Sequence, residues 1–315
     1  MNQSKKITEG AMLTAVYIIL LLVIVFVPVI QIIGIFLLPV PFVMYTSKHG
    51  FTAGVLMMVI ASILAMLLAT LVTLPLTLLA GIGGIAVGSG MYREKNAYET
   101  WAQGTIGHIA GFVIVLFLIQ VVFQINLFQE LDSAMNESMD MIRSVIGQMN
   151  LTTDVEEPLE LVEEQMKLMK EMVPVGIAIL SIIMAFIAQW LTYKIVNRVE
   201  RKQFAFPAFK NLDFPIAVIW IFFLTIILSI MDLDPDGVLF TVVINVEALC
   251  VFLLVVQGFS FIFFYMDHKK IHQAVPITIV ILSLFLPFIF MFIVRIIGII
   301  DLGFRLKQRV RQQKP

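Results

Sequence analysis

The chain has 315 residues, a formal net charge of −1, and 60% hydrophobic against 14% charged residues. Its mean hydropathy of +0.99 is higher than a soluble domain needs for its core, which excludes an ordinary soluble globular protein. The near-zero net charge provides no general basic field, so we expect no nucleic-acid partner. The single cysteine, Cys250, excludes a disulfide framework and a cysteine-based metal cluster.

The apolar runs are long enough for helical membrane spans, since a crossing takes about 20 apolar residues. Lys5 and Lys6 precede the first run as in a signal peptide, but no cleavage site of small residues follows, so we expect this segment to be retained. The runs cover residues 10–27, 30–46, 51–71, 74–91, 104–127, 173–196, 214–231, 238–265 and 275–300. The sequence predicts an all-α fold, a polytopic transmembrane helix bundle of about eight or nine spans.

Basic residues in the short connections predict the orientation of these spans. With the N-terminus inside, the basic connections are cytoplasmic and residues 128–172 lie outside. Nine full spans would then place the basic tail, 305–314, outside, which conflicts with the rule that basic segments stay on the cytoplasmic side. Either the last run is a hairpin broken near Pro287, or the tail is an exception. The run 275–300 is short for two crossings, which favours a single one.

Residues 128–172 form the only sizeable segment between spans, and their apolar residues recur at helical spacing. The segment holds eleven acidic and three basic residues, a net charge of −8. We expect an acidic, extracytoplasmic, amphipathic helical hairpin. The simplest interpretation is that its two helices pack on each other. A lid over a binding site or a surface for a partner is the alternative.

Polar side chains within apolar runs are costly in hydrocarbon, so they indicate either interhelical hydrogen bonds or a functional site. The ligand-binding candidates are Thr77, Gln120, Gln124, Asn126, Asn245 and Gln257. Three of them, at 120, 124 and 126, share the outer end of one run, where they would line a pocket beneath the hairpin. Ordinary packing is the alternative for each.

Charged residues at the ends of runs form a second group, with a structural or functional role. Glu9 directly precedes the first run, and Asp301 and Arg305 follow the last. Asp301 and Arg305 are four residues apart, so they can pair along one helix face.

No catalytic or metal-binding pattern accompanies these residues. The sequence has no glycine-rich phosphate loop followed by Lys-Ser/Thr and no Gly-x-Ser-x-Gly motif, and its four histidines do not form a metal pair on an apolar helix. We therefore expect no enzyme activity, no ATPase of its own, no metal and no cofactor.

Ala11 and Ala15 open the first run four residues apart, which places both small side chains on one helix face. Another helix backbone can approach such a face closely, so the pair is a candidate for helix docking. Chance is the alternative, because small residues are common in transmembrane helices.

Residues 6–127 resemble the membrane-embedded substrate-binding subunits of energy-coupling-factor vitamin transporters. The resemblance is carried by the motifs that begin at Glu9, Leu37, Lys48 and Gly81, namely EGAMLTA, LLPVP, KHGFTAG and GIGGIAVG. It implies that the alanine pair docks on a transmembrane coupling subunit, which works with a separate ATPase module. It also implies a six-helix core, formed here by residues 1–127 and 173–200.

Over nearly its full length the chain resembles the uncharacterised YybS-type family of bacterial membrane proteins, which has a domain of unknown function. The C-terminal features that carry this resemblance are Asn245, Val256-Gln-Gly258 and Ile297-Gly-Ile-Ile-Asp301 with Arg305. The resemblance implies a bacterial plasma membrane location and names no substrate. The hairpin 128–172 and the further helices and basic tail in 201–315 depart from the vitamin-binding subunits.

The sequence therefore favours an integral membrane protein that binds a small molecule, as a transport-related subunit without its own ATPase. The alternative is a membrane scaffold or regulator that binds a protein partner. Both interpretations include contact with membrane lipid.

Overall fold

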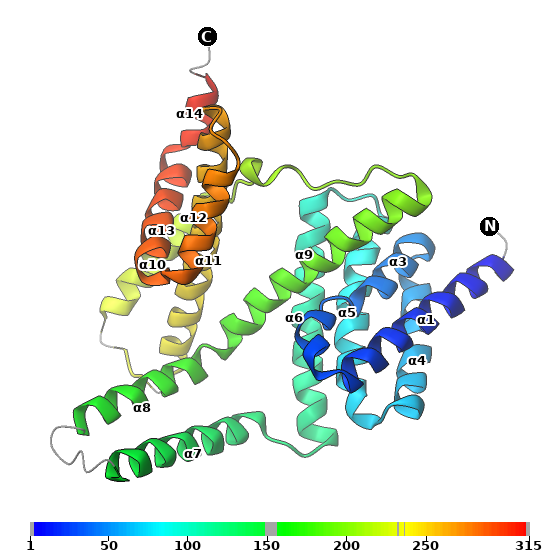
Figure 1. Ribbon diagram of the computed structural model, residues 1–315, viewed down its shortest axis with the longest axis horizontal. Coiled ribbons are helices and arrows are strands. Elements are labelled where there is room, and N and C mark those ends of the chain that lie inside the picture. The colour runs from blue at the N-terminus through cyan, green and yellow to red at the C-terminus, as the bar shows by residue number, and fades with distance from the viewer. Residues whose placement is uncertain (1–2, 149–155, 232, 236, 313–315) are drawn as a thin grey trace. The chain divides into compact units, whose positions relative to one another are not determined.

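The computed structural model describes residues 3–148, 156–231, 233–235 and 237–312 (Figure 1). All regular secondary structure in these ranges is helical, and eight helical segments are long and apolar enough to cross a membrane. This confirms the predicted all-α, multi-span fold.

The chain divides into two compact units. Unit 1 comprises residues 1–170 and 180–205, and unit 2 comprises residues 171–179 and 206–315. The long helix α9 (Val173–Glu200) contributes its first residues to unit 2 and the rest to unit 1.

Unit 1 begins with six helices that account for five of the apolar runs. They are α1 (Gln3–Phe26), α2 (Gln31–Gly34), α3 (Pro39–His49), α4 (Phe51–Leu68), α5 (Leu74–Tyr92) and α6 (Ala97–Val122). Local sequence sets several of their starts. Pro39 and Pro75 lie in the first turns of α3 and α5, where a missing N–H costs no hydrogen bond. Asn96 caps α6 by accepting a hydrogen bond from the Glu99 backbone N–H at 2.9 Å.

The core of unit 1 lies between α1, α3, α4 and α5. Tyr17 and Leu21 of α1 pack against Phe42 of α3, and all three are fully buried. The glycines of α5 allow α3 to approach closely, because a Cβ at Gly84 would collide with the Pro39 carbonyl. Unit 1 is therefore a bundle in which α1 presents one face to the core and leaves the other exposed.

The segment predicted as a helical hairpin forms α7 (Leu127–Gln148) and α8 (Glu156–Glu171). Two ion pairs join the helices: Lys170 Nζ lies 2.6 Å from Asp132 Oδ1, and Arg143 Nη2 lies 4.0 Å from Glu163 Oε2. The location of this hairpin outside the membrane stays a prediction, and residues 149–155 between the helices lie outside the described ranges.

Unit 2 is built mainly from helices in the last third of the chain. They are α10 (Ala217–Ile230), α11 (Val238–His268), α12 (Ala274–Phe285), α13 (Pro287–Phe304) and α14 (Leu306–Gln312). Helix α10 has only 14 residues, and the core of the unit forms where Phe222 meets Cys250, Leu254 and Leu302.

The last apolar run does not form one continuous helix, and of its two helices only α13 is long enough to cross a membrane. It breaks at Leu286, between α12 and α13. Residues 257 and 260 of α11 contact residues 301 and 307, so α13 runs in the same direction as α11. Helix α12 joins the end of α11 to the start of α13 and therefore runs the opposite way (Figure 1).

The reversal brings the basic tail back to the end of unit 2 that holds the segment 206–213. Arg311 Nη2 donates to the Asn211 side chain at 2.7 Å there. The tail and Lys210 therefore lie at the same end of unit 2, the arrangement that the positive-inside rule favours for basic segments.

Candidate functional site

Two glycines bring α11 and α13 into backbone contact. A Cβ added to Gly258 would collide with the Val294 carbonyl, and one added to Gly298 would collide with the Leu254 carbonyl. Close approach of this kind is typical of small residues at helix crossings in membranes. Gln257 lies beside this crossing and Asp301 lies above it. The close approach of the helices brings the two side chains within reach of each other.

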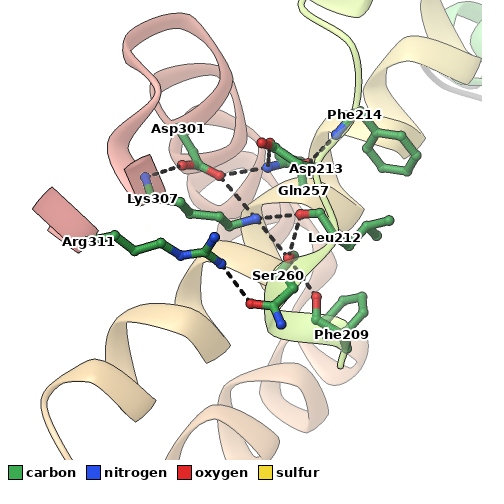
Figure 2. A network of polar contacts seen from close by, with 10 residues as sticks. Phe209, Leu212, Asp213, Phe214, Gln257, Ser260, Asp301, Lys307 and Arg311 are labelled. Atoms are coloured by element: carbon green, nitrogen blue, oxygen red, sulfur yellow. Dashed lines mark hydrogen bonds and ion pairs between the residues drawn. The ribbon is translucent and has the colours of Figure 1, made fainter. Parts of the chain in front are cut away.

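Gln257 is the centre of a buried polar network at this end of unit 2 (Figure 2). Its Nε2 donates to Asp301 Oδ2 at 2.6 Å and to Asp213 Oδ1 at 3.1 Å. Its Oε1 accepts a hydrogen bond from the Phe214 backbone N–H at 3.1 Å. One amide thereby joins α11, α13 and the segment that leads into α10.

Lys307 completes the network from α14 (Figure 2). Its Nζ donates to the Leu212 carbonyl at 2.5 Å and the Ser260 hydroxyl at 2.9 Å, and lies 3.4 Å from Asp301 Oδ2. Each of the three ammonium protons therefore has an acceptor. Asp301 Oδ1 also accepts from the Lys307 backbone N–H at 3.2 Å. These bonds hold α14 against the end of the bundle.

The Asp301–Lys307 pair is almost entirely removed from solvent, since the two side chains are 2% and 4% exposed. Burial lowers the pKa of the Lys307 ammonium, and the negative charges of Asp301 and Asp213 oppose this shift. Loss of either partner would leave an uncompensated buried charge. The pair and its additional hydrogen bonds therefore hold Asp301 and Lys307 in one geometry.

The predicted pairing of Asp301 with Arg305 is replaced by the pairing with Lys307. Helix α13 ends at Phe304, and Arg305 takes a left-handed backbone conformation with φ of 51°. The four-residue spacing therefore no longer runs along a helix, and the chain turns so that Lys307 faces Asp301. The Arg305 side chain is exposed.

A pocket of about 270 Å³ opens beside the ion pair. Its lining combines charged and apolar side chains: Asp213, Phe214, Ile216, Asp301, Leu302, Arg305, Lys307 and Gln308. Asp213, Arg305 and Gln308 are solvent-exposed, whereas Asp301 and Lys307 are buried. The pocket therefore offers both charge signs and hydrogen-bonding groups around a small volume, a combination suited to a small polar molecule.

Asn245, a second predicted ligand residue in unit 2, holds the junction of α8 and α9. Its Oδ1 accepts from the Val175 backbone N–H at 2.8 Å, and its Nδ2 donates to the Glu171 carbonyl at 2.7 Å. Nearby, Thr241 Oγ1 donates to the Glu171 carboxylate at 2.6 Å. Both polar atoms of the Asn245 side chain therefore have hydrogen-bond partners within the fold.

The predicted ligand residues of unit 1 do not come together. Thr77 is buried, accepts a hydrogen bond from the Tyr17 hydroxyl at 2.8 Å and donates to the Thr73 carbonyl at 3.1 Å. Gln120 and Gln124 are exposed. Asn126 caps α7, since its Oδ1 accepts from the backbone N–H of Phe128 at 3.1 Å.

Glu9 lies in an ionic cluster that joins three helices of unit 1. Its carboxylate lies 3.2 Å from Lys48 Nζ and 2.9 Å from His49 Nε2, both on α3. Lys48 Nζ also lies 3.1 Å from Glu200 at the end of α9. The cluster therefore joins the motif that begins at Glu9 to the one that begins at Lys48.

Ala11 and Ala15 lie on the exposed side of α1. The buried side of the same helix carries Leu13 and Tyr17, which face the core of unit 1. Unit 1 therefore leaves the alanine face uncovered by the described residues.

Sequence reasoning missed Lys307, Ser260 and Asp213. Ser260 follows Gln257 by three residues and so shares its helix face, a signal that was present in the sequence. Lys307 belongs to a tail with several basic residues, and nothing in the local sequence distinguishes it from Arg305 or Arg309.

Comparison with known proteins places the chain in a family. The family model described as "Predicted membrane protein (DUF2232)" matches residues 15–302. The uncharacterized protein YybS of Bacillus subtilis (strain 168) is 28% identical over 312 residues, which cover 99% of this chain and 100% of the relative. No solved structure matches. The chain therefore belongs to the DUF2232 family of predicted membrane proteins.

Proposed function

We propose that this protein is a multi-pass protein of the bacterial plasma membrane that binds a small polar molecule in the pocket of unit 2. It acts by binding rather than by catalysis, as a transport-related subunit that depends on a separate ATPase module. The observation that carries the proposal is the pocket of about 270 Å³ beside the buried Asp301–Lys307 pair. The network fixes the pocket wall, and the exposed Arg305 and Gln308 side chains remain to contact a ligand.

The exposed alanine face of α1 supports the further part of the proposal, docking on a coupling subunit. Ala11 and Ala15 would allow a partner helix to approach closely, while the opposite face of α1 keeps its contacts with the unit 1 core. The resemblance of residues 6–127 to vitamin-binding subunits is the reason to expect a coupling subunit as the partner.

Native mass spectrometry of the gently purified protein tests the ligand. Wild type should carry a small molecule that is lost from Arg305→Gln and from Gln308→Ala, because both side chains line the pocket. Both are exposed, so melting temperatures should stay near wild type. A wild-type protein without a bound small molecule, or binding unchanged in both variants, would refute the pocket.

Co-purification tests the docking face. Ala11→Leu with Ala15→Leu should abolish recovery of a membrane partner. The melting temperature should stay unchanged, because the larger side chains would project away from the core. The matched control is Met12→Leu, a volume-conserving change at another exposed position of α1. If the partner list of the double variant equals that of wild type, the docking face is refuted.

A scaffold or regulator that binds a protein partner is the second candidate. The acidic α7–α8 hairpin favours it, because its net charge of −8 over residues 128–172 suits a basic partner. Recovery of a protein partner from wild type that is lost when the hairpin carboxylates are neutralised, with no small molecule bound, would support this candidate instead.

A further inference from the structure

The α7–α8 hairpin carries an apolar strip that its own packing leaves uncovered. On α7 the strip includes Leu127, Met141 and Val145, which are 38%, 69% and 49% exposed. On α8 it includes Leu161, Val162 and Met169, which are 56%, 38% and 73% exposed. Six large apolar side chains are thus exposed on a segment that is highly charged overall.

Helical spacing separates this strip from the charges. Positions 127, 134, 138, 141 and 145 follow one face of α7, and positions 158, 161, 162, 165 and 169 follow one face of α8. None of these ten positions carries an acidic or basic residue. The charges of α7 and α8, including the Lys170–Asp132 pair, lie on the other faces. Each helix therefore has one charged face and one exposed face without charge.

The chain holds both helices at the ends of candidate membrane spans. Helix α6 ends at Val122, and α7 begins at Leu127. Helix α8 ends at Glu171, and α9 begins at Val173. Figure 1 shows α7 leaving the end of α6 sideways rather than continuing its axis. The turn after α6 directs α7 away from the axis of that span, as expected for a helix that lies along a membrane surface.

From this segregation and this attachment we infer that the α7–α8 hairpin lies in the membrane interface, with its two apolar strips in contact with phospholipid. Amphipathic helices bind there with the apolar face at the boundary of headgroups and acyl chains and the polar face toward water. The net charge of −8 disfavours anionic headgroups, so the lipid is of the zwitterionic, phosphatidylcholine or phosphatidylethanolamine class. This inference is independent of the pocket in unit 2.

Environment-sensitive labels on the full chain in phosphatidylcholine nanodiscs test the inference. In a Cys250→Ser background, single cysteines replace Val145 or Met169 on the strips, and Glu137 or Glu164 on the charged faces as matched controls. All four positions are exposed, so the label does not disturb packing. Each protein carries the fluorophore NBD, and the quencher is phosphatidylcholine with a doxyl group near the headgroup end of its acyl chain.

We expect blue-shifted NBD emission at Val145→Cys and Met169→Cys, with quenching by doxyl lipid at least about twofold stronger than at the controls. Water-like emission at the strip positions would overturn the inference. Blue-shifted emission without lipid quenching would also overturn it, because protein would then cover the strip. Disulfide formation between copies through Val145→Cys would identify that protein as a second copy of the chain.

Discussion

Gln257 Nε2 of α11 lies 2.6 Å from Asp301 Oδ2 of α13, directly above the crossing where Gly258 and Gly298 let the two backbones meet. The backbone contact and the polar contact depend on each other. Separation of the helices would lengthen the hydrogen bond, and loss of the bond would leave a buried carboxylate with fewer donors. The consequences can be measured separately.

Loss of one member of the buried ion pair should be strongly destabilising. Asp301→Asn leaves the Lys307 ammonium without its carboxylate, and Lys307→Met leaves Asp301 without its ammonium. Each should lower the free energy of unfolding by about 3 kcal/mol, with a smaller loss in the double variant. Chemical denaturation in detergent measures this. Arg305→Gln is the exposed control and should stay within about 0.5 kcal/mol of wild type; equal losses at 301 and 305 would contradict the pairing.

Exchange of the charges distinguishes the two candidate partners of Asp301. Asp301→Lys with Lys307→Asp keeps opposite charges in the buried pair, whereas Asp301→Arg with Arg305→Asp places a cation next to Lys307. We expect the first exchange to retain more stability than the second in a melting experiment. The reverse order would show that Arg305 is the partner.

The glycine crossing should not tolerate a methyl group. Gly258→Ala and Gly298→Ala place a Cβ against the Val294 and Leu254 carbonyls, respectively, so the helices must separate. Each should lower stability by about 2 kcal/mol, within the range for overpacking. Gly176→Ala in α9 is the control, because nothing lies within 4 Å of its added Cβ. That change should raise stability by about 0.5 kcal/mol through helix propensity. A neutral result at both crossing glycines would show that the helices stand further apart.

Alkaline pH should favour the folded state through Lys307. Its folded pKa is below the ordinary value of 10.5, so the unfolded chain binds more protons between these two values, and stability rises with pH there. The stability difference between wild type and Lys307→Met should therefore increase as pH rises from the folded pKa toward 10.5. A difference that shrinks over this range would mean that the ion pair raises the pKa.

The sidedness of the chain can be read with single cysteines in a Cys250→Ser background. Glu137→Cys on the charged face of α7 should react with an impermeant maleimide added to intact cells, and Gln203→Cys should not. Because α13 returns to the end of unit 2 that holds segment 206–213, Gln312→Cys should behave like Gln203→Cys. Labelling of the tail from outside would contradict this arrangement.

The sequence predicted the features that depend on composition and local spacing. The cost of a polar group in hydrocarbon indicated Gln257 and Asp301, and both lie in one network. The predicted partner of Asp301 was wrong, because residues four apart face each other only along a continuous helix. The left-handed turn at Arg305 ends α13 before that spacing applies. That turn depends on tertiary contacts of Lys307 with Leu212 and Ser260, which no local pattern contains.

The polar group of unit 1 failed to come together for a similar reason. Helix α6 ends at Val122, and Gln124 has a φ of 56°, so it no longer lies one turn above Gln120. Asn126 then begins the next helix. The division into a six-helix core and additional C-terminal helices stays a prediction.

The break at Leu286 has a consequence for how the chain enters the membrane. The reversal between α12 and α13 contains only apolar residues, and its backbone stays bonded, with Leu286 N–H donating to Leu282 and Phe290 N–H donating to Leu286. Such a turn exposes little unpaired backbone to hydrocarbon. Residues 274–304 can therefore insert as one helical pair, and no charged connection has to be translocated after His268. We therefore expect the basic tail to stay on the same side of the membrane as the connection 269–273.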